Sequence, residues 1–459
     1  MGTDQTAPRL EREAIQSIIL KRRPTPYCGC HVLLKIEDAP QGRELLNKLR
    51  PYVLSAAEYG RQETWMAVVV TYAGLVALEV PESSLASFPA AFRDGMAARA
   101  SSVGDTGESS PEHWDRPFGT GDIHVALTLL STTNDIFQAN LQKARSVLVS
   151  LPGIKLLARE DFAQSPDERT PFGYKDGISF PNIIGNDVSP IVDNEEPIAA
   201  GEFIFGYPGE AGRMLAMPQP DLLGRNGTFV SFRKLHSKVA AFRRFLKANA
   251  TSALSAELLA AKMIGRWASG APLMLAPEQD NPQLGSDLQR MNNFTYAQDP
   301  KGLRCPIGAH IRRMNPRDTA LEVMTNVKIH RIIRHGTVYG PPLPENVMDD
   351  DGKERGIFFI FLSAKAPETF EFLKKEWINT GNFLGLGTEE DPIAGEHTGA
   401  GTFTIPMKPI RRRLQGMERF TVTRGGEYGF VPSLPALRWL ASSPAERETA
   451  ASADFSTGS

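Results

Sequence analysis

The stretch HVLLKIED at residues 31–38 begins the pattern from which the fold is predicted. Its apolar residues alternate as in a β-strand, and apolar residues at helical spacing follow over 42–54. A β-branched run at 65–71 predicts a buried strand, whereas 100–118, rich in Gly, Ser, Pro and acidic residues, predicts a long surface loop. The remaining elements of this first set are a strand at 124–130, a helix at 136–150 and a strand at 154–157.

A second set of predicted elements repeats this order with different residues. It comprises strands at 228–234, 357–363 and 420–423 and helices at 237–247, 256–267 and 367–378. Such a mixture favours an α+β protein with two domains, each an antiparallel sheet with helices on one face. The chain of 459 residues also exceeds what one core organises, because single hydrophobic cores stop growing at about 250 to 300 residues.

The composition excludes several kinds of partner. Fifty-one basic residues stand against 53 acidic ones, a net charge of -2, so no basic excess indicates a nucleic-acid partner. No run approaches the roughly 18 apolar residues of a membrane span, and the first residues lack the apolar core of a signal peptide. We therefore expect a cytoplasmic protein with no membrane partner.

The three cysteines, Cys28, Cys30 and Cys305, are too few for a disulfide framework. Cys28 and Cys30 followed by His31 suggest a metal site only superficially. The strand predicted there sends Cys30 and His31 to opposite faces, and a zinc site needs four well-placed ligands.

Three segments shaped by Gly and Pro contain side chains suited to chemistry. They are TPFGYKDGISFPN at 170–182, CPIGAHIRRMNPRD at 305–318 and IHRIIRHGTVYG at 329–340, which contain Asp176, His310 and Arg334. Each has a structural interpretation when it is taken alone. Asp beside Gly is ordinary in turns, a single His among apolar residues is more often part of a core than a ligand, and Arg331 and Arg334 share one turn if their segment is helical. Together they supply an acid, an imidazole and a guanidinium, which predicts an enzyme but no reaction.

The segment FGYKDGIS at 172–179 resembles the GxxDG signature of the dye-decolorizing peroxidases. Five further segments resemble this family in the same order: GEFIFGY (201–207), LGRNGTFVSFRKL (223–235), GRWASGAPL (265–273), CPIGAHIRRMNPR (305–317) and GGEYGFVPSL (425–434). The resemblance covers about residues 15–440 and is to the long subgroup of fungal enzymes and their bacterial relatives. It implies tandem ferredoxin-like domains and one non-covalent haem b.

The resemblance also suggests how the chain divides. The predicted parts are a polar arm at 1–14, an N-terminal ferredoxin-like domain at 15–195, a C-terminal haem-binding ferredoxin-like domain at 196–445 and a polar tail at 446–459. The N-terminal domain carries the GxxDG segment, and the haem is expected to be held mainly by the C-terminal domain.

Roles for individual residues follow from the positions they match in the family. His310 matches the proximal ligand of the haem iron, and Asp391 in EEDPIAG matches the carboxylate on the other nitrogen of that imidazole. Asp176 matches the distal acid, which moves a proton between the peroxide oxygens, and Arg334 matches the cation that stabilises charge as the O–O bond breaks. An acidic pH optimum is expected, because the reference pKa of Asp is about 3.9.

Other positions have weaker matches. Ile357 and Phe359 match an apolar wall of the haem pocket, and Tyr339 matches a tyrosine proposed to oxidise bulky donors at the surface. Arg317 is expected to pair with a haem propionate, although pairing with Asp318 explains it equally well.

The function implied is a peroxidase that uses hydrogen peroxide to oxidise dyes, phenols or similar donors. The alternative is a haem-handling protein that stores haem or releases its iron, and a third option keeps the haem but catalyses an oxygenase or hydrolase reaction. Passive binding needs neither Asp176 nor Arg334, which favours the peroxidase.

Overall fold

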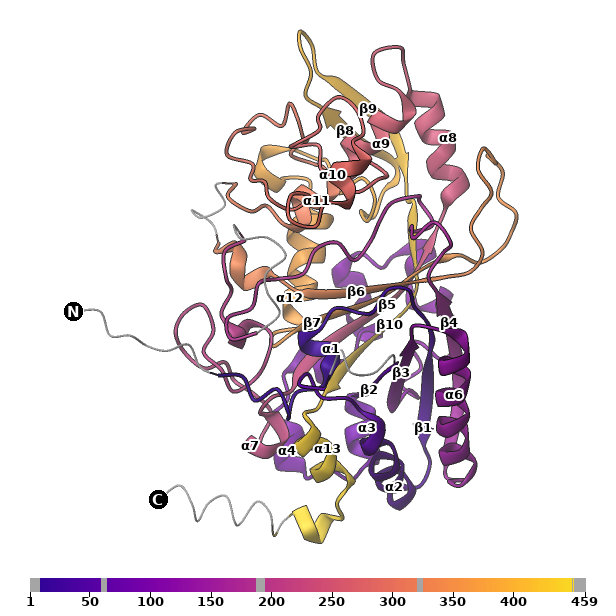
Figure 1. The fold of residues 1–459 in the computed structure, drawn as a ribbon, viewed down its shortest axis with the longest axis vertical. Helices are drawn as coiled ribbons and strands as arrows, with labels where there is room; N and C mark the ends of the chain where they lie inside the picture. The colour runs from indigo at the N-terminus through magenta and orange to yellow at the C-terminus, as the bar shows by residue number, and fades with distance from the viewer. Residues whose placement is uncertain (1–8, 59–63, 187–194, 320–324, 448, 450–459) are drawn as a thin grey trace, which may run out of the picture.

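The computed structural model describes residues 9–58, 64–186, 195–319, 325–447 and 449. Its centre is an eight-stranded sheet in the order β4-β1-β3-β2-β10-β5-β7-β6 (Figure 1). The strands are β1 (Cys28–Ile36), β2 (Thr64–Val70), β3 (Val125–Ser131), β4 (Ile154–Ala163), β5 (Thr228–Ser237), β6 (Ile333–Tyr339), β7 (Gly356–Ser363) and β10 (Thr421–Val431). A separate hairpin consists of β8 (Thr398–Ile405) and β9 (Arg412–Glu418).

Each half of the large sheet has the strand order of a ferredoxin-like domain. In β4-β1-β3-β2, and again in β10-β5-β7-β6, the last strand of the half flanks the first, and the first lies beside the third. All of these neighbours are antiparallel. The two halves join where Phe430 of β10 pairs with Val70 of β2, and β4 and β6, the outer strands, also lie against each other. The α+β prediction of two antiparallel halves is confirmed, with the addition that they form one continuous sheet.

Helices cover the ends and faces of this sheet. They are α1 (Ser17–Leu20), α2 (Ala39–Leu49), α3 (Tyr72–Ala77), α4 (Glu82–Ala86), α5 (Ala90–Asp94), α6 (Asn134–Val149), α7 (Asp221–Gly224), α8 (Val239–Asn249), α9 (Ala256–Ile264), α10 (Pro282–Ser286), α11 (His310–Met314), α12 (Glu368–Phe372) and α13 (Leu434–Ala441). In Figure 1, α2, α3 and α6 lie towards the lower end and α8 to α11 towards the upper end. None of the helices in the described ranges is long and apolar enough to cross a bilayer.

Helix α6 illustrates how the sequence determines these elements. The Thr133 side chain accepts a hydrogen bond from the amide of Ile136, which satisfies a donor that the first turn leaves free. Phe137, Leu141 and Ala144 recur at intervals of four and three and are the buried residues of the helix. They pack with residues of β1 and β3 in one hydrophobic cluster, and burying a side chain such as Leu141 stabilises the fold by about 1.5–3 kcal/mol.

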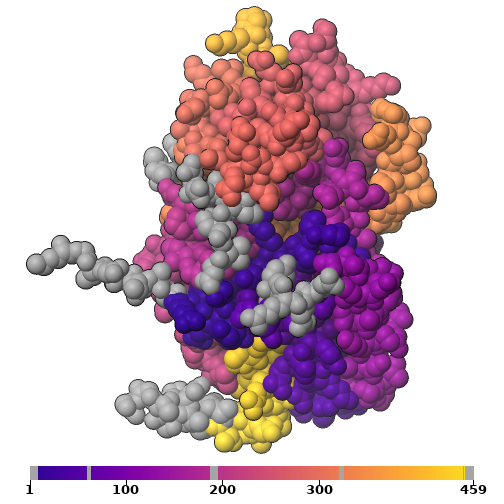
Figure 2. Space-filling model, viewed as in Figure 1, coloured from indigo at the N-terminus to yellow at the C-terminus, as the bar shows by residue number. Residues whose placement is uncertain are grey.

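Residues after β10 contact residues near the start of the described chain. The amide of Leu434 donates to the carbonyl of Ala14 at 2.8 Å, and Nε2 of Gln16 donates to the carbonyl of Pro432 at 2.7 Å. In Figure 2, yellow C-terminal residues lie beside indigo N-terminal ones at the surface. The predicted domain limits stay predictions. The structure does not describe residues 187–194, which lie beside the expected boundary at 195, nor residues 1–8 of the arm and most of the tail.

The prediction of a long surface loop at 100–118 is only partly right. This stretch forms three short 3-10 helices (Ala97–Val103, Gly107–Ser109 and Pro111–His113), and Trp114 and Phe118 are buried. Asp105 forms a buried ion pair with Arg233 of β5, 2.5 Å between Oδ1 and Nη2. Gly, Ser and Pro do favour turns, and seven residues of the stretch are exposed as expected, but others are buried against distant parts of the chain.

The condition under which Arg331 and Arg334 would share a helical turn is not met, because Ile333–Tyr339 form strand β6. Arg331 follows a short 3-10 helix (Val327–His330), whereas Arg334 lies within the strand. The two arginines therefore do not share a helical turn.

Candidate active site

A cavity of about 330 Å³ lies against the second half of the sheet. Alternate residues of a strand point to the same face, so Leu235 and Ser237 of β5 and Ile357 and Phe359 of β7 line it together. Apolar side chains from outside the large sheet also line the cavity, among them those of Ile264, Ile311, Met314, Leu373, Ile378 and Ile393. The cavity is therefore mainly apolar and of a size typical of small-molecule and cofactor sites, about 300–1,000 Å³.

His310, the first residue of α11, reaches this cavity with one ring nitrogen already bonded. Its Nδ1 lies 2.8 Å from Oδ2 of Asp391, and Oδ1 of Asp391 accepts from the amides of Ile393 and Ala394 at 2.9 Å each. Asp391 is fully buried (0% exposed), while the His310 side chain is 24% exposed. The carboxylate fixes the ring, and Nε2 is the nitrogen left to bind a metal.

Neighbouring groups keep the carboxyl group of Asp391 ionised. Burial alone raises the pKa of this carboxyl, but the His310 imidazole and the Arg313 guanidinium lower it more, to about 2. Asp391 is therefore an anion at any ordinary pH, which makes the His310 imidazole a stronger electron donor.

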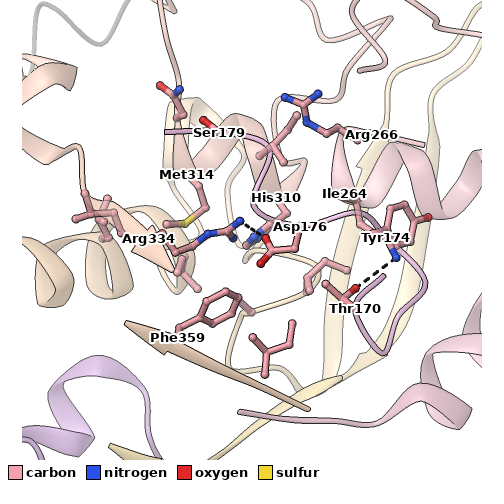
Figure 3. A pocket seen from close by; sticks show the side chains of 18 of the residues that line it. Thr170, Tyr174, Asp176, Ser179, Ile264, Arg266, His310, Met314, Arg334 and Phe359 are labelled. Atoms are coloured by element: carbon pink, nitrogen blue, oxygen red, sulfur yellow. Dashed lines mark hydrogen bonds and ion pairs between the residues drawn. The ribbon is translucent and has the colours of Figure 1, made fainter. Parts of the chain in front are cut away.

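Asp176 and Arg334 form an ion pair inside the same cavity. Asp176 lies in a turn where Gly177 has a positive φ of 74°, and its Oδ1 accepts from Nη2 of Arg334. The Arg334 guanidinium also lies over the ring of Phe359, 5.0 Å from its centroid. Figure 3 shows the side chains of Asp176, Arg334 and His310 converging, although they come from three distant segments.

Asp176 is an anion for a related reason. Its burial raises the pKa, but Arg334 and then Arg23 lower it more, and the backbone amide of Gly177 adds to this effect. The pKa of Asp176 thus lies below its ordinary value, and the group is ready to accept a proton.

The guanidinium groups of Arg266, which is buried, and Arg317, which is partly buried, line another part of the cavity. Arg317 donates to the carbonyls of Asn292 and Phe294 at 3.1 and 2.9 Å and stacks on the Phe294 ring at 4.0 Å, while Arg266 donates to Oδ1 of Asn292 at 2.7 Å. Neither forms an ion pair with a carboxylate among the described residues. Asp318, the alternative partner of Arg317, instead accepts from two backbone amides.

The structure corrects the interpretation of Tyr339 as a residue at the surface. Tyr339 is only 7% exposed, its ring lies 4.6 Å from that of Phe358, and its hydroxyl has no hydrogen-bond partner among the residues that the structure describes. In a strand, residues an odd number apart point to opposite faces, so Tyr339 points away from the face that carries Arg334. A bulky donor cannot contact it there.

Arg266, Tyr296 and Lys374 also line the cavity and were not predicted. Arg266 lies in GRWASGAPL, one of the segments that resemble the family, and that match could have indicated its place in the site. Lys374 donates to the carbonyl of Ala394 at 3.2 Å, and burial lowers its pKa to about 8. The sequence around Lys374 shows only an amphipathic helix, which gives no sign of this position.

Known proteins are similar to this chain in sequence and in fold. No family model matches the chain. Peroxidase 2 of Mycetinis scorodonius is 32% identical over 375 residues, 76% of this chain and 71% of its own. A dye-decolorizing peroxidase of Mycena epipterygia is 30% identical over 450 residues, 88% of this chain and 82% of its own.

Solved structures agree. An ancestral D-type dye-decolorizing peroxidase superimposes with a TM-score of 0.83 and 29% identity, covering 95% of this chain and all of that one. A fungal peroxidase from Auricularia auricula-judae does so with a TM-score of 0.81 and 27% identity, over 95% of this chain and 100% of its own.

The fold, the imidazole and the acid–arginine pair define an oxidoreductase that acts on hydrogen peroxide, a peroxidase. The chain belongs to the dye-decolorizing peroxidase family. Membership of this family implies a haem cofactor.

Proposed function

We propose that this peroxidase holds one non-covalent haem b per chain, with His310 as the iron ligand, and oxidises phenols and dyes in one-electron steps. One observation carries the proposal: a single imidazole, backed by a buried carboxylate, shares an apolar cavity with an ionised acid–arginine pair. A solved dye-decolorizing peroxidase in complex with 2,6-dimethoxyphenol supports a phenolic donor. The cytoplasmic location remains a prediction.

The residues around the cavity fit a haem. No group of three or more His, Cys, Asp or Glu side chains in the described ranges could hold a metal, so a metal at His310 needs most of its ligands from a bound molecule. The apolar walls suit a porphyrin. Arg317 and Arg266 have no carboxylate partner within the described parts of the chain, and they suit the two propionates, because such groups are stabilised by charge-assisted hydrogen bonds.

When bound, the haem supplies the iron at which peroxide reacts and the electrons that reduce it. Asp176 takes a proton from one peroxide oxygen and gives it to the other, so that water leaves as the O–O bond breaks. Oδ1 of Asp176 is engaged by Arg334, and Oδ2 is therefore the oxygen that carries the proton. Arg334 stabilises the negative charge that develops on the departing oxygen, and Asp391 holds the His310 ring in one orientation.

A visible spectrum recorded with and without hydrogen peroxide tests this function. We expect a Soret band that changes within a second of mixing with one equivalent of peroxide and returns when a phenol is added. A haem-storage or iron-releasing protein would show no such change, or only a slow bleaching with loss of iron. The Asp176–Arg334 ion pair favours the first outcome, because holding haem passively requires neither group.

The lowered pKa of Asp176 predicts an acidic working range. The carboxylate must be ionised to accept a proton, and a depressed pKa keeps it ionised as the pH falls past its ordinary value. The rate of reaction with peroxide should therefore be flat from pH 7 downwards and fall only in strong acid. Dye oxidation also consumes protons, so its steady-state rate should peak at roughly pH 3 to 5.

The measurement is a pair of pH profiles, one with a dye and one with a small phenol, for the wild type and Asp176→Asn. An optimum at neutral pH for both donors, retained in the variant, would contradict the carboxylate mechanism.

A further inference from the structure

Gly336 lies in β6 at the point where Asp176 approaches the sheet. It is two residues from Arg334 and therefore on the same face of the strand, and it pairs with Phe359 of β7. A Cβ added at position 336 would overlap Oδ2 of Asp176 and would lie 2.9 Å from Cε1 of Phe359. Oδ2 is the oxygen that Arg334 leaves free.

Backbone conformation does not explain a glycine here. Gly336 is absent from the glycines with positive φ, and it is paired in regular register within the strand. Glycine inside a strand lowers stability relative to alanine and often marks a place where another group approaches closely. The approaching group at position 336 is the carboxylate of Asp176.

The carboxylate has little freedom to move aside. Arg334 holds Oδ1, and the ring of Phe359, over which the Arg334 guanidinium lies, borders the same position from β7. A methyl group at 336 would push the carboxylate away from β6 and loosen its contact with Arg334.

We propose that Gly336 is a positioning residue for the peroxide reaction, because its missing side chain provides the space that sets where Oδ2 of Asp176 lies. This inference rests on the proposed function, in which Oδ2 carries the proton. A misplacement of about 1 Å in such a group can slow a reaction by roughly a hundredfold.

The test is Gly336→Ala, measured for haem content and for the rate of reaction with peroxide by stopped-flow spectroscopy. We expect normal haem content, a rate lowered about 10- to 100-fold, and an acidic limb moved to higher pH, since weaker contact with Arg334 raises the pKa of Asp176. Val338→Ile adds one methyl group on the same face of β6 at a half-buried position and should leave the rate and the pH profile unchanged.

The double variant Asp176→Ala/Gly336→Ala separates positioning from general damage. Because Asp176→Ala removes the overlapping oxygen, adding Gly336→Ala to it should change the rate less than twofold, and should restore folding if the single variant folds poorly. A wild-type rate and pH profile in Gly336→Ala, a further tenfold loss in the double variant, or a folding defect that Asp176→Ala does not relieve would each overturn the proposal. Failure of the proposed function would instead appear in the wild type, as a Soret band indifferent to peroxide.

Discussion

His310→Ala is expected to yield a folded protein that purifies with little or no haem. His310 is the one histidine among the residues that line the cavity, so no other imidazole is placed to bind the iron. The substitution also leaves Asp391 buried without the ring that lowers its pKa, and an unpaired buried polar group costs about 1–3 kcal/mol. We therefore expect a lower melting temperature together with the loss of haem.

The measurement is the ratio of haem absorbance to protein absorbance, with circular dichroism to show that the fold persists. Asp391→Asn is the matched control: it retains the ligand, so it should retain haem, with a shifted spectrum because the imidazole becomes a weaker donor. Near-normal haem content with an unchanged Soret band in His310→Ala would refute the assignment.

Arg334→Leu should have the largest effect on chemistry while leaving the haem in place. The guanidinium is the cation paired with Asp176, and removing one such stabilising group from an active site typically slows the reaction about 10²- to 10³-fold. The change also removes the largest effect that lowers the pKa of Asp176. The carboxyl should then protonate at higher pH, so the residual activity should disappear earlier on acidification.

Stopped-flow mixing with peroxide measures this effect directly. Arg334→Lys keeps the charge but loses the planar fork, and its rate should lie between those of the wild type and Arg334→Leu. Asp176→Asn is expected to be less damaging than Arg334→Leu, because water can carry protons in place of Asp176, whereas Arg334 is the cation that is paired with the site of the reaction. Wild-type rates in both Arg334→Leu and Asp176→Asn would mean that neither residue acts on peroxide.

Local patterns predicted many of the strands and helices, because period-two and helical spacings are properties of short stretches. The runs at 31–38 and 65–71 became β1 and β2 with ends shifted by a few residues, and 136–150 became α6. The pairing of distant segments came from the resemblance to a family, since no local pattern brings Asp176, His310 and Arg334 together.

The predictions that the structure corrects share a physical cause. Asp105, within the loop expected at 100–118, is buried because it pairs with Arg233 of β5, which is distant in the sequence. The segment at 329–340 has apolar residues that suit a helix or a strand, and only its pairing with β7 decides between them. Tyr339 was expected at the surface because of its match to the family, whereas its ring is buried against Phe358. The space at Gly336 is likewise visible only once Asp176 lies against it.

The position of β10 determines how late in synthesis the sheet can be completed. This strand is the last of the sheet in sequence, yet it lies between β2 and β5 and carries Thr421 and Thr423 on the cavity wall. Until it leaves the ribosome, β2 and β5 present unpaired edges and the haem pocket lacks part of a wall. A chain that ends before residue 421 therefore lacks both the strand that joins the two halves of the sheet and part of the cavity wall, and we expect it to aggregate rather than to act as a slower enzyme.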